Sequence, residues 1–309
     1  MGILVVGTSF MDVKGFPHDA YVPTGRNVGH VEYVHGGVSR NVAEDIANVE
    51  LRPTFLTIVD DTPLGTAIYQ KLVNHKVNMD YTLTVPNGMG TWLAVFDNNG
   101  DLAGSVSCRP DFMPVLDLLN EKGDEIFADV DSVVLEIDLP KEIVKKVLNL
   151  SEKYGKKVFS IVSNMHIAAE RRDLLQKLDC LICNELEAGI LFSDDYSNKE
   201  PEEMADIVSN HINHANIKSM IVTLGEKGSV YAIKNGEKGT YPARKVHVKD
   251  TTGAGDAFCA GVSIGLTYGK TMPEAIEIGT HLAASVITSS ENVCPRFLPE
   301  EFGLDVKFE

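Results

Sequence analysis

Short apolar runs recur along the sequence, and nearly every one is followed by a segment with helical spacing of apolar residues. The runs are ILVVG at 3–7, SVVLEI at 132–137, KVFSIV at 157–162, CLIC at 180–183 and SMIVTL at 219–224. A run without polar alternation is typical of a strand that is buried on both faces. Strands that alternate with helices form right-handed βαβ units. We therefore predict a three-layer α/β/α fold with a mostly parallel central sheet, in which ligands bind at the carboxyl ends of the strands.

Two strand-rich segments interrupt this alternation, at about 12–35 and 81–108. In the second, TWLAVFD and LAGSVS flank Asn98-Asn99-Gly100, which indicates a β-hairpin whose turn needs positive φ at its centre. We expect both segments to form one small β-sheet lid over a site, because such elements often cover the place of reaction. No linker divides the chain, so residues 1–309 are predicted to be a single domain.

The remaining elements follow from the same patterns. Further strands are predicted at 54–59, 229–233 and, at a sheet edge, 244–248. Helices are predicted from the di-glycine segment to Val49 and at 64–75, 140–154, 168–178, 201–213, 256–268 and 273–289.

Charge and cysteine content exclude several classes of protein. The net charge is −16 and no Lys/Arg cluster forms a basic stripe, which argues against a nucleic-acid partner. No apolar stretch is long enough to span a bilayer, and the N-terminus lacks the basic region of a signal peptide. Five scattered cysteines indicate free thiols and a cytoplasmic location. Cys180 and Cys183 form a C-x-x-C inside an apolar run, which favours packing over metal binding.

The segment KDTTGAGDAFCAG, residues 249–261, carries the strongest chemical signal. Gly253, Ala254 and Gly255 precede a predicted helix that begins near Asp256, and small residues let the backbone aim several N–H groups at one point. Such donors at the positive end of a helix bind an anion. A carboxylate there makes chemical sense if Asp256 accepts a proton from a hydroxyl that attacks a phosphoryl group. The alternative is that Asp256 only caps the helix.

Three further positions fit a ligand site. Gly36 and Gly37 would let the backbone approach a small polyol closely, with a plain turn as the alternative. Asp12, expected at the end of the first parallel strand, could accept two hydroxyl hydrogen bonds. Asn184 and Glu187 can both project from one helix start. The alternative for Glu187 is an exposed glutamate in the first turn, which interacts favourably with the helix dipole.

DTTGAGDAFCAG closely resembles the C-terminal motif of the ribokinase-like (PfkB) carbohydrate and nucleoside kinases. Four more segments resemble that family in the same order along the chain: GTSFMDV, HGGVSRN, NELEA and VTLGEKGSV. The resemblance implies an ATP- and Mg²⁺-dependent enzyme with Asp256 as base and Gly253, Ala254 and Gly255 as the anion site. It also implies that homodimers form through the β lid.

The same resemblance implies roles for individual residues. Asp12, Gly36, Gly37 and Asn41 would bind a small-molecule nucleoside or sugar. Asn184 would lie at the nucleotide and Glu187 near the magnesium ion, while Thr223, Gly225 and Gly228 would contact ATP. Asp250 and the carbonyl of Thr252 would bind a monovalent cation, which is potassium in activated relatives.

The substrate is indicated by finer likenesses. GGVSRN resembles the corresponding motif of pseudouridine kinases, where Arg40 could pair with a base carbonyl; a surface or capping arginine is the alternative. VLEIDLP departs from the pseudouridine-kinase pattern, because it has Glu136 and Asp138 where those enzymes tend to have an Asp and an Asn; Glu136 at this strand end would contact substrate. We therefore expect phosphoryl transfer to a primary hydroxyl, with the pseudouridine 5′-hydroxyl as the first candidate. A sugar or sugar-phosphate kinase and a non-catalytic nucleoside or sugar sensor are the alternatives.

Overall fold

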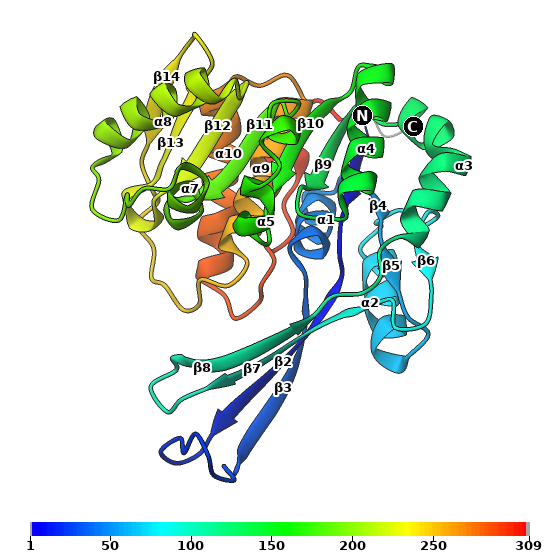
Figure 1. The fold of residues 1–309 in the computed structure, drawn as a ribbon, viewed down its shortest axis with the longest axis vertical. Helices are drawn as coiled ribbons and strands as arrows, with labels where there is room; N and C mark the ends of the chain where they lie inside the picture. Colours follow the sequence, from blue (N-terminus) through cyan, green and yellow to red (C-terminus); the bar gives the residue numbers. More distant parts are fainter. Residues whose placement is uncertain (1, 307–309) are drawn as a thin grey trace.

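An eight-stranded sheet forms the centre of the computed structural model, which describes residues 2–306 (Figure 1). The strand order is β14-β13-β12-β11-β10-β9-β1-β4, and the six strands from β12 to β4 are parallel. Only β13 and β14 run antiparallel to their neighbours. The strands are β1 (Ile3–Val6), β4 (Thr54–Leu56), β9 (Ser132–Glu136), β10 (Lys157–Ile161), β11 (Cys180–Asn184), β12 (Ser219–Thr223), β13 (Ser229–Ile233) and β14 (Lys238–Tyr241).

Alternating strand side chains fill two separate cores, one on each face of this sheet. In β1, Ile3 and Val5 point to one core, and Leu4 and Val6 point to the other. The first core is covered by α1 (Val38–Asn48), α2 (Pro63–Asn74), α9 (Ala254–Thr267) and α10 (Met272–Ile287). The second core is covered by α3 (Pro114–Ala128), α4 (Lys141–Tyr154), α5 (Met165–Ala169), α6 (Arg172–Leu175), α7 (Glu185–Phe192) and α8 (Pro201–Ala215). The predicted three-layer α/β/α class is confirmed.

A second sheet projects from this body (Figure 1). We call it the lid sheet; its order is β3-β2-β7-β8, with β2 (Phe10–Pro17), β3 (Gly29–Gly36), β7 (Gly90–Phe96) and β8 (Leu102–Cys108). Strand β2 follows β1 after three residues, and β3 leads directly into α1. The base of the lid sheet is therefore joined to the central sheet at the carboxyl end of β1. In the β7–β8 turn, Gly100 has φ +86°.

Three element predictions were wrong or incomplete, and some elements were not predicted at all. The predicted strand 54–59 breaks at the buried Thr57: β4 stays in the central sheet, while β5 (Ile58–Val59) pairs with β6 (Leu83–Thr84). The predicted helix 168–178 is divided at Arg171, whose side chain donates to the carbonyls of Ile137 and Leu139. Residues 244–248 form no strand, because Pro242 lacks an N–H and follows directly after the true edge strand, β14. Helix α3 was not predicted.

Two negative predictions concern the described residues as well. None of their helices has the length and apolar character needed to cross a membrane. Cys180 and Cys183 are free and buried, and they lie in opposite cores, because residues three apart in a strand point to opposite faces. Burial raises the pKa of Cys180 to about 12. The C-x-x-C spacing of Cys180 and Cys183 therefore lies in a strand that is buried on both faces.

Candidate active site

A glycine turn opens α9 and leaves two backbone donors free. Gly253 has φ +83°, and a Cβ on it would lie 2.0 Å from the carbonyl oxygen of Asn292, so no other residue fits there. The Ala254 amide donates to the Thr251 carbonyl at 3.2 Å, and the helical hydrogen bonds begin with Ala257. Within the described residues, the amides of Gly255 and Asp256 therefore have no backbone acceptor. The positive end of the α9 dipole therefore lies at the predicted anion site. The Ala254 amide, which was predicted to bind the anion, is already hydrogen-bonded to Thr251.

The Asp256 carboxyl lies beside these amides and has an unusual environment. Asn41, on α1, donates from Nδ2 to Asp256 Oδ2 at 2.6 Å. Burial raises the pKa of Asp256 to about 7, although the Asn41 hydrogen bond and the Arg40 charge favour the ionised form. A carboxyl that titrates near neutral pH can both take up and release a proton. The alternative that Asp256 caps the helix does not hold, because Gly253 occupies the cap position of α9 and no side chain forms a capping hydrogen bond there.

A cavity of about 250 Å³ lies over Asp256 and is lined by residues from six elements, α7 among them. Its lining includes the ends of three neighbouring parallel strands, β10, β11 and β12, and the starts of α1 and α9. The cavity therefore lies at the carboxyl ends of the parallel strands, where ligands of such sheets are expected to bind. Its polar lining is Ser163, Asn184, Glu187, Thr223 and Asp256.

Asn184 and Glu187 form a reciprocal capping box at the start of α7. The Glu187 amide donates to Asn184 Oδ1, and the Asn184 amide donates to Glu187 Oε2, both at 2.9 Å. Burial raises the pKa of Glu187. Gly225 and Gly228, with φ of +58° and +94°, lie in the turn after β12 and outside the lining of the cavity.

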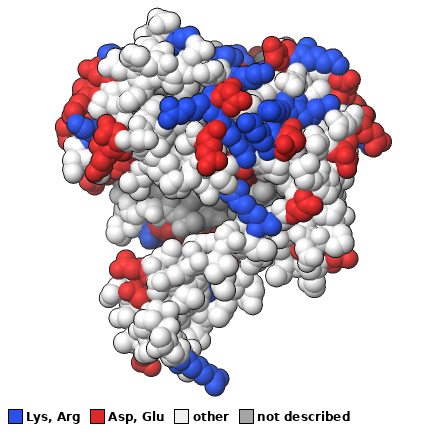
Figure 2. All heavy atoms as spheres, viewed as in Figure 1, with Lys and Arg blue, Asp and Glu red and all other residues white. Residues whose placement is uncertain are grey.

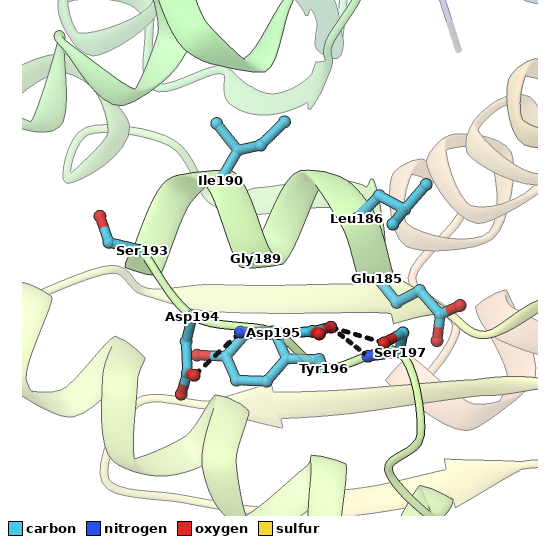
Figure 3. Close-up of a pocket in the computed structure, with 9 residues that line it drawn as sticks. All are labelled: Glu185, Leu186, Gly189, Ile190, Ser193, Asp194, Asp195, Tyr196 and Ser197. Carbon is cyan, nitrogen blue, oxygen red and sulfur yellow. Dashed lines mark hydrogen bonds between the residues drawn. The ribbon is translucent and has the colours of Figure 1, made fainter.

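A larger cavity, of about 560 Å³, lies elsewhere on the molecule (Figure 3). It is formed by α7 and the loop 193–197, where Asp195 accepts hydrogen bonds from the amide and hydroxyl of Ser197. Neither Asp256 nor the glycine turn lines it. The smaller cavity is the candidate active site, because it holds Asp256, whose pKa is raised to about 7, beside the unpaired amides of Gly255 and Asp256.

Asp12 occupies a different place from the one predicted. It is the third residue of β2 and belongs to the lid sheet, not to the end of the first parallel strand. Gly36 makes room for its carboxylate, since a Cβ on Gly36 would lie 2.4 Å from Asp12 Oδ1. Burial raises the pKa of Asp12 against the opposing charges of Lys14 and Arg40.

The face of the lid sheet that carries Asp12 is turned toward the active site. Lys14, on the same face, is close enough to Asp250 to favour ionisation of that carboxyl. Asp250 immediately precedes the segment 251–255 that opens α9. Figure 2 shows a hollow between the lid sheet and the body. Gly37, between β3 and α1, has φ +95°, and a Cβ there would lie 2.8 Å from the Thr8 carbonyl oxygen.

Two predicted substrate contacts are buried beneath the site. Glu136 is 1% exposed, and its carboxylate accepts hydrogen bonds from Thr8, Ser39 and Ser163 at 2.8–3.1 Å. It therefore joins the ends of β1 and β10 to the start of α1. Burial and the nearby Asp138 raise the pKa of Glu136.

Arg40 is also inside the protein, at 0% exposure. Its guanidinium pairs with Glu44 at 2.6 Å and donates to the His35 carbonyl. In this structure protein groups satisfy the Arg40 guanidinium, and its contact with a base stays a prediction. Its charge still acts on Asp12 and Asp256 through space.

Asn292 was not predicted, although its position links both halves of the site. Its Nδ2 donates to the His35 carbonyl at 2.8 Å, and its own carbonyl oxygen packs against Gly253. Because 257 residues separate Asn292 from His35, no local sequence signal could have revealed this contact.

The predicted cation residues lie together before α9. The Thr252 amide donates to Asp250 Oδ1 at 2.8 Å. Partial burial is the largest single influence on Asp250 and opposes its ionisation, but the hydrogen bonds from Thr252 and Thr251 and the charge of Lys14 together outweigh it and lower the pKa. The described residues contain no group of three or more His, Cys, Asp or Glu arranged to hold a metal ion.

Comparison with known proteins gives consistent matches over almost the whole chain. The family described as pfkB family carbohydrate kinase matches residues 2–294. A guanosine-inosine kinase of Exiguobacterium acetylicum is 32% identical over 94% of this chain and 95% of its own length. The pseudouridine kinase of Escherichia coli K12 is 23% identical, over 89% and 86%. The structure of Arabidopsis thaliana ribokinase complexed with ribose and ATP has a TM-score of 0.83 at 21% identity, covering 97% of each chain.

The family match spans the glycine turn, Asp256 and the lid sheet alike. The fold of the solved relative agrees with the three-layer body described above. The protein is a phosphotransferase and belongs to the pfkB family of carbohydrate kinases.

Proposed function

We propose that the protein transfers the γ-phosphoryl group of ATP to the primary hydroxyl of a nucleoside. The observation that carries this proposal is the Asp256 carboxyl, with its pKa raised to about 7, beside the free amides of α9. The ATP-complexed Arabidopsis ribokinase supports ATP as the donor, and the guanosine-inosine kinase supports a nucleoside as the acceptor.

The proposed reaction uses each of these groups once. Asp256 takes the proton of the acceptor hydroxyl as its oxygen bonds to the γ-phosphorus. The bond between that phosphorus and the bridging oxygen breaks, and ADP leaves with the electron pair. The amides of Gly255 and Asp256 and the helix dipole stabilise the negative charge on the transferring group. The lid sheet would close over the site and exclude water.

Magnesium fits the donor set that Asn184 and Glu187 bring to the lining of the cavity. Glu187 is a partly buried carboxylate that forms no ion pair within the described residues, and Asn184 supplies an amide beside it. We propose that these two residues hold Mg²⁺ on the ATP phosphates, mainly through water. Bound there, Mg²⁺ neutralises charge on the phosphate oxygens. Thr223, Gly225 and Gly228 would contact the nucleotide, and Asp250 with the Thr252 carbonyl would hold potassium.

The acceptor is proposed to be a purine nucleoside such as guanosine or inosine, with pseudouridine second. The 32% identity to the guanosine-inosine kinase, against 23% to the pseudouridine kinase, favours this order. Asp12, Gly36, Gly37 and Asn41 would bind the sugar. A plain sugar such as ribose is the second candidate class, because the ribose-bound Arabidopsis enzyme shares the fold.

ADP release from ATP and Mg²⁺, measured with guanosine, inosine, pseudouridine and ribose and with or without potassium, tests the proposal. We expect the highest kcat/KM with a purine nucleoside and a product phosphorylated on its primary hydroxyl. A higher kcat/KM with ribose than with any nucleoside would contradict it.

We also propose a cytoplasmic homodimer formed through the lid sheet. Tyr33, Val13, Leu93 and Val106 form one row across its four strands, on the face opposite Asp12. Tyr33, Leu93 and Val106 are exposed, and large exposed apolar surfaces are typical of interfaces. Leu93→Lys should therefore shift a dimer toward monomer in sedimentation; an unchanged dimer would contradict this interface.

A further inference from the structure

The lid face that carries Asp12 also carries aromatic rings. Strand pairing places Asp12 opposite Val34 on β3 and opposite Trp92 on β7. Phe10 lies two residues before Asp12 in the same strand, on the same face and about 7 Å away. A carboxylate and two aromatic side chains therefore share one small area of the surface that faces Asp250.

Glycines on both neighbouring strands shape this area. Phe10 is paired with Gly36 on one side and with Gly90 on the other. A Cβ on Gly36 would lie 2.4 Å from the Asp12 carboxylate, and a Cβ on Gly90 would lie 2.6 Å from the Phe10 ring. The carboxylate thus lies over one glycine and the ring over the other. Both are held flat on the sheet, and neither glycine position accepts a side chain without displacing its neighbour.

These rings have exposed surface that no other ring covers. Phe10 and Trp92 are both partly exposed. Farther along the lid sheet, Phe16 stacks on Phe96 and on His30, at 4.9 and 5.1 Å between ring centroids. Trp92 meets this stack only edge-on, through Phe96, and among the described residues Phe10 has no ring contact of this kind. The two rings nearest Asp12 are therefore the two whose faces remain available to a planar partner.

A ligand with hydroxyls and a planar group matches this arrangement. Carboxylates accept hydrogen bonds from hydroxyls, and aromatic rings stack on the planar faces of nucleobases. An acceptor without a base would leave the two rings in contact with water, at a cost in apolar exposure. The area is consequently suited to a ribose linked to a nucleobase, with the sugar at Asp12 and the base against the rings.

We propose that Phe10 and Trp92 form a base-stacking subsite that makes the enzyme select nucleosides over free sugars. The proposal rests on the proposed nucleoside kinase function and assigns its specificity to these two residues. Phe10 and Trp92 contact the base, while Asp12 and the glycine turn at α9 act on the sugar and the phosphoryl group.

Phe10→Leu and Trp92→Leu test this directly by steady-state kinetics with inosine and with ribose. Stacking of one base on an aromatic ring corresponds to about a tenfold to hundredfold change in affinity, so KM for inosine should rise by that factor. The kcat should stay within about threefold, because the reacting atoms are untouched. KM for ribose should stay nearly unchanged in both variants.

Tyr33→Leu is the matched control, since it removes an aromatic ring from the opposite face of the same sheet. It should leave KM for inosine unchanged. Phe10→Tyr and Trp92→Phe keep a ring and should restore most of the affinity, which guards against a leucine variant that merely folds poorly. Equal losses with inosine and ribose, or no loss with inosine, would overturn the subsite.

Trp92 also provides a binding signal, because it is the single tryptophan of the chain. Saturating inosine without ATP should change its fluorescence, and saturating ribose should not. An enzyme that phosphorylates inosine with no fluorescence change and no effect of either leucine variant contradicts only the subsite. An enzyme inactive on every nucleoside contradicts the proposed function and the subsite together.

Discussion

The glycine turn at α9 and the Asp12 face of the lid sheet are built in opposite ways. At α9, Gly253, Gly255 and Asp256 are near neighbours in sequence, and one turn of backbone fixes their geometry. On the lid sheet, Phe10, Gly36 and Trp92 come from three strands, and only strand register brings them together. The residues proposed for phosphoryl transfer are thus neighbours in the sequence, whereas the residues proposed to select the substrate are far apart in it. Changes at α9 should therefore alter kcat, and changes on the lid sheet should alter KM.

Asp256→Asn should have the largest effect on turnover. We expect kcat to fall by at least about two orders of magnitude, the usual contribution of a general base, while the Trp92 fluorescence response to inosine persists. Asp194→Asn, in the larger cavity beside α7, is the control and should retain full activity. Normal turnover in Asp256→Asn, or a comparable loss in the control, would show that the chemistry lies elsewhere.

Gly253→Ala should lower kcat by about tenfold or more, because displaced reacting groups lose rate steeply. The new Cβ would meet the Asn292 carbonyl oxygen at 2.0 Å and must move the turn. Gly269→Ala is a matched control: its φ is similar, at +77°, but nothing lies within 4 Å of the new Cβ. If both variants lose activity equally, strain at positive φ explains the loss, and the turn has no special role.

Gly36→Ala should act on binding instead. Its Cβ would displace the Asp12 carboxylate, and loss of one charged hydrogen bond raises KM by about tenfold. Steady-state kinetics should show kcat changing much less than KM. A variant with reduced kcat and normal KM would break the proposed division between the two regions.

Arg40→Met should have the smallest effect on turnover, because the arginine is buried below the site. Removing one partner of the buried Arg40–Glu44 pair costs about 3–5 kcal/mol in the free energy of unfolding. Denaturant unfolding measures that loss, and Arg40→Met/Glu44→Leu should recover part of it. A stable Arg40→Met protein with a greatly raised KM would show that the arginine reaches the substrate.

The same contrast explains what could be predicted from sequence. Asp256, Asn184 and Glu187 lie in short motifs, and the alternating strands and helices fixed the sheet edge on which they meet. Arg40 and Glu136 stand in motifs too, but their burial depends on Glu44, Thr8 and Ser39, which the patterns do not connect to them. Asp12 was assigned to the wrong sheet, since three residues after β1 suffice for the chain to enter the lid sheet.

The pH dependence of kcat/KM tests most directly whether Asp256 is the base. A general base acts in its ionised form, so a pKa raised to about 7 removes activity as the pH falls below 7. We predict that kcat/KM for inosine declines about tenfold per pH unit below about 7 and levels off above it, and that the residual activity of Asp256→Asn lacks this decline. A profile that is flat from pH 5 to 9, or a decline that persists in Asp256→Asn, would contradict the account.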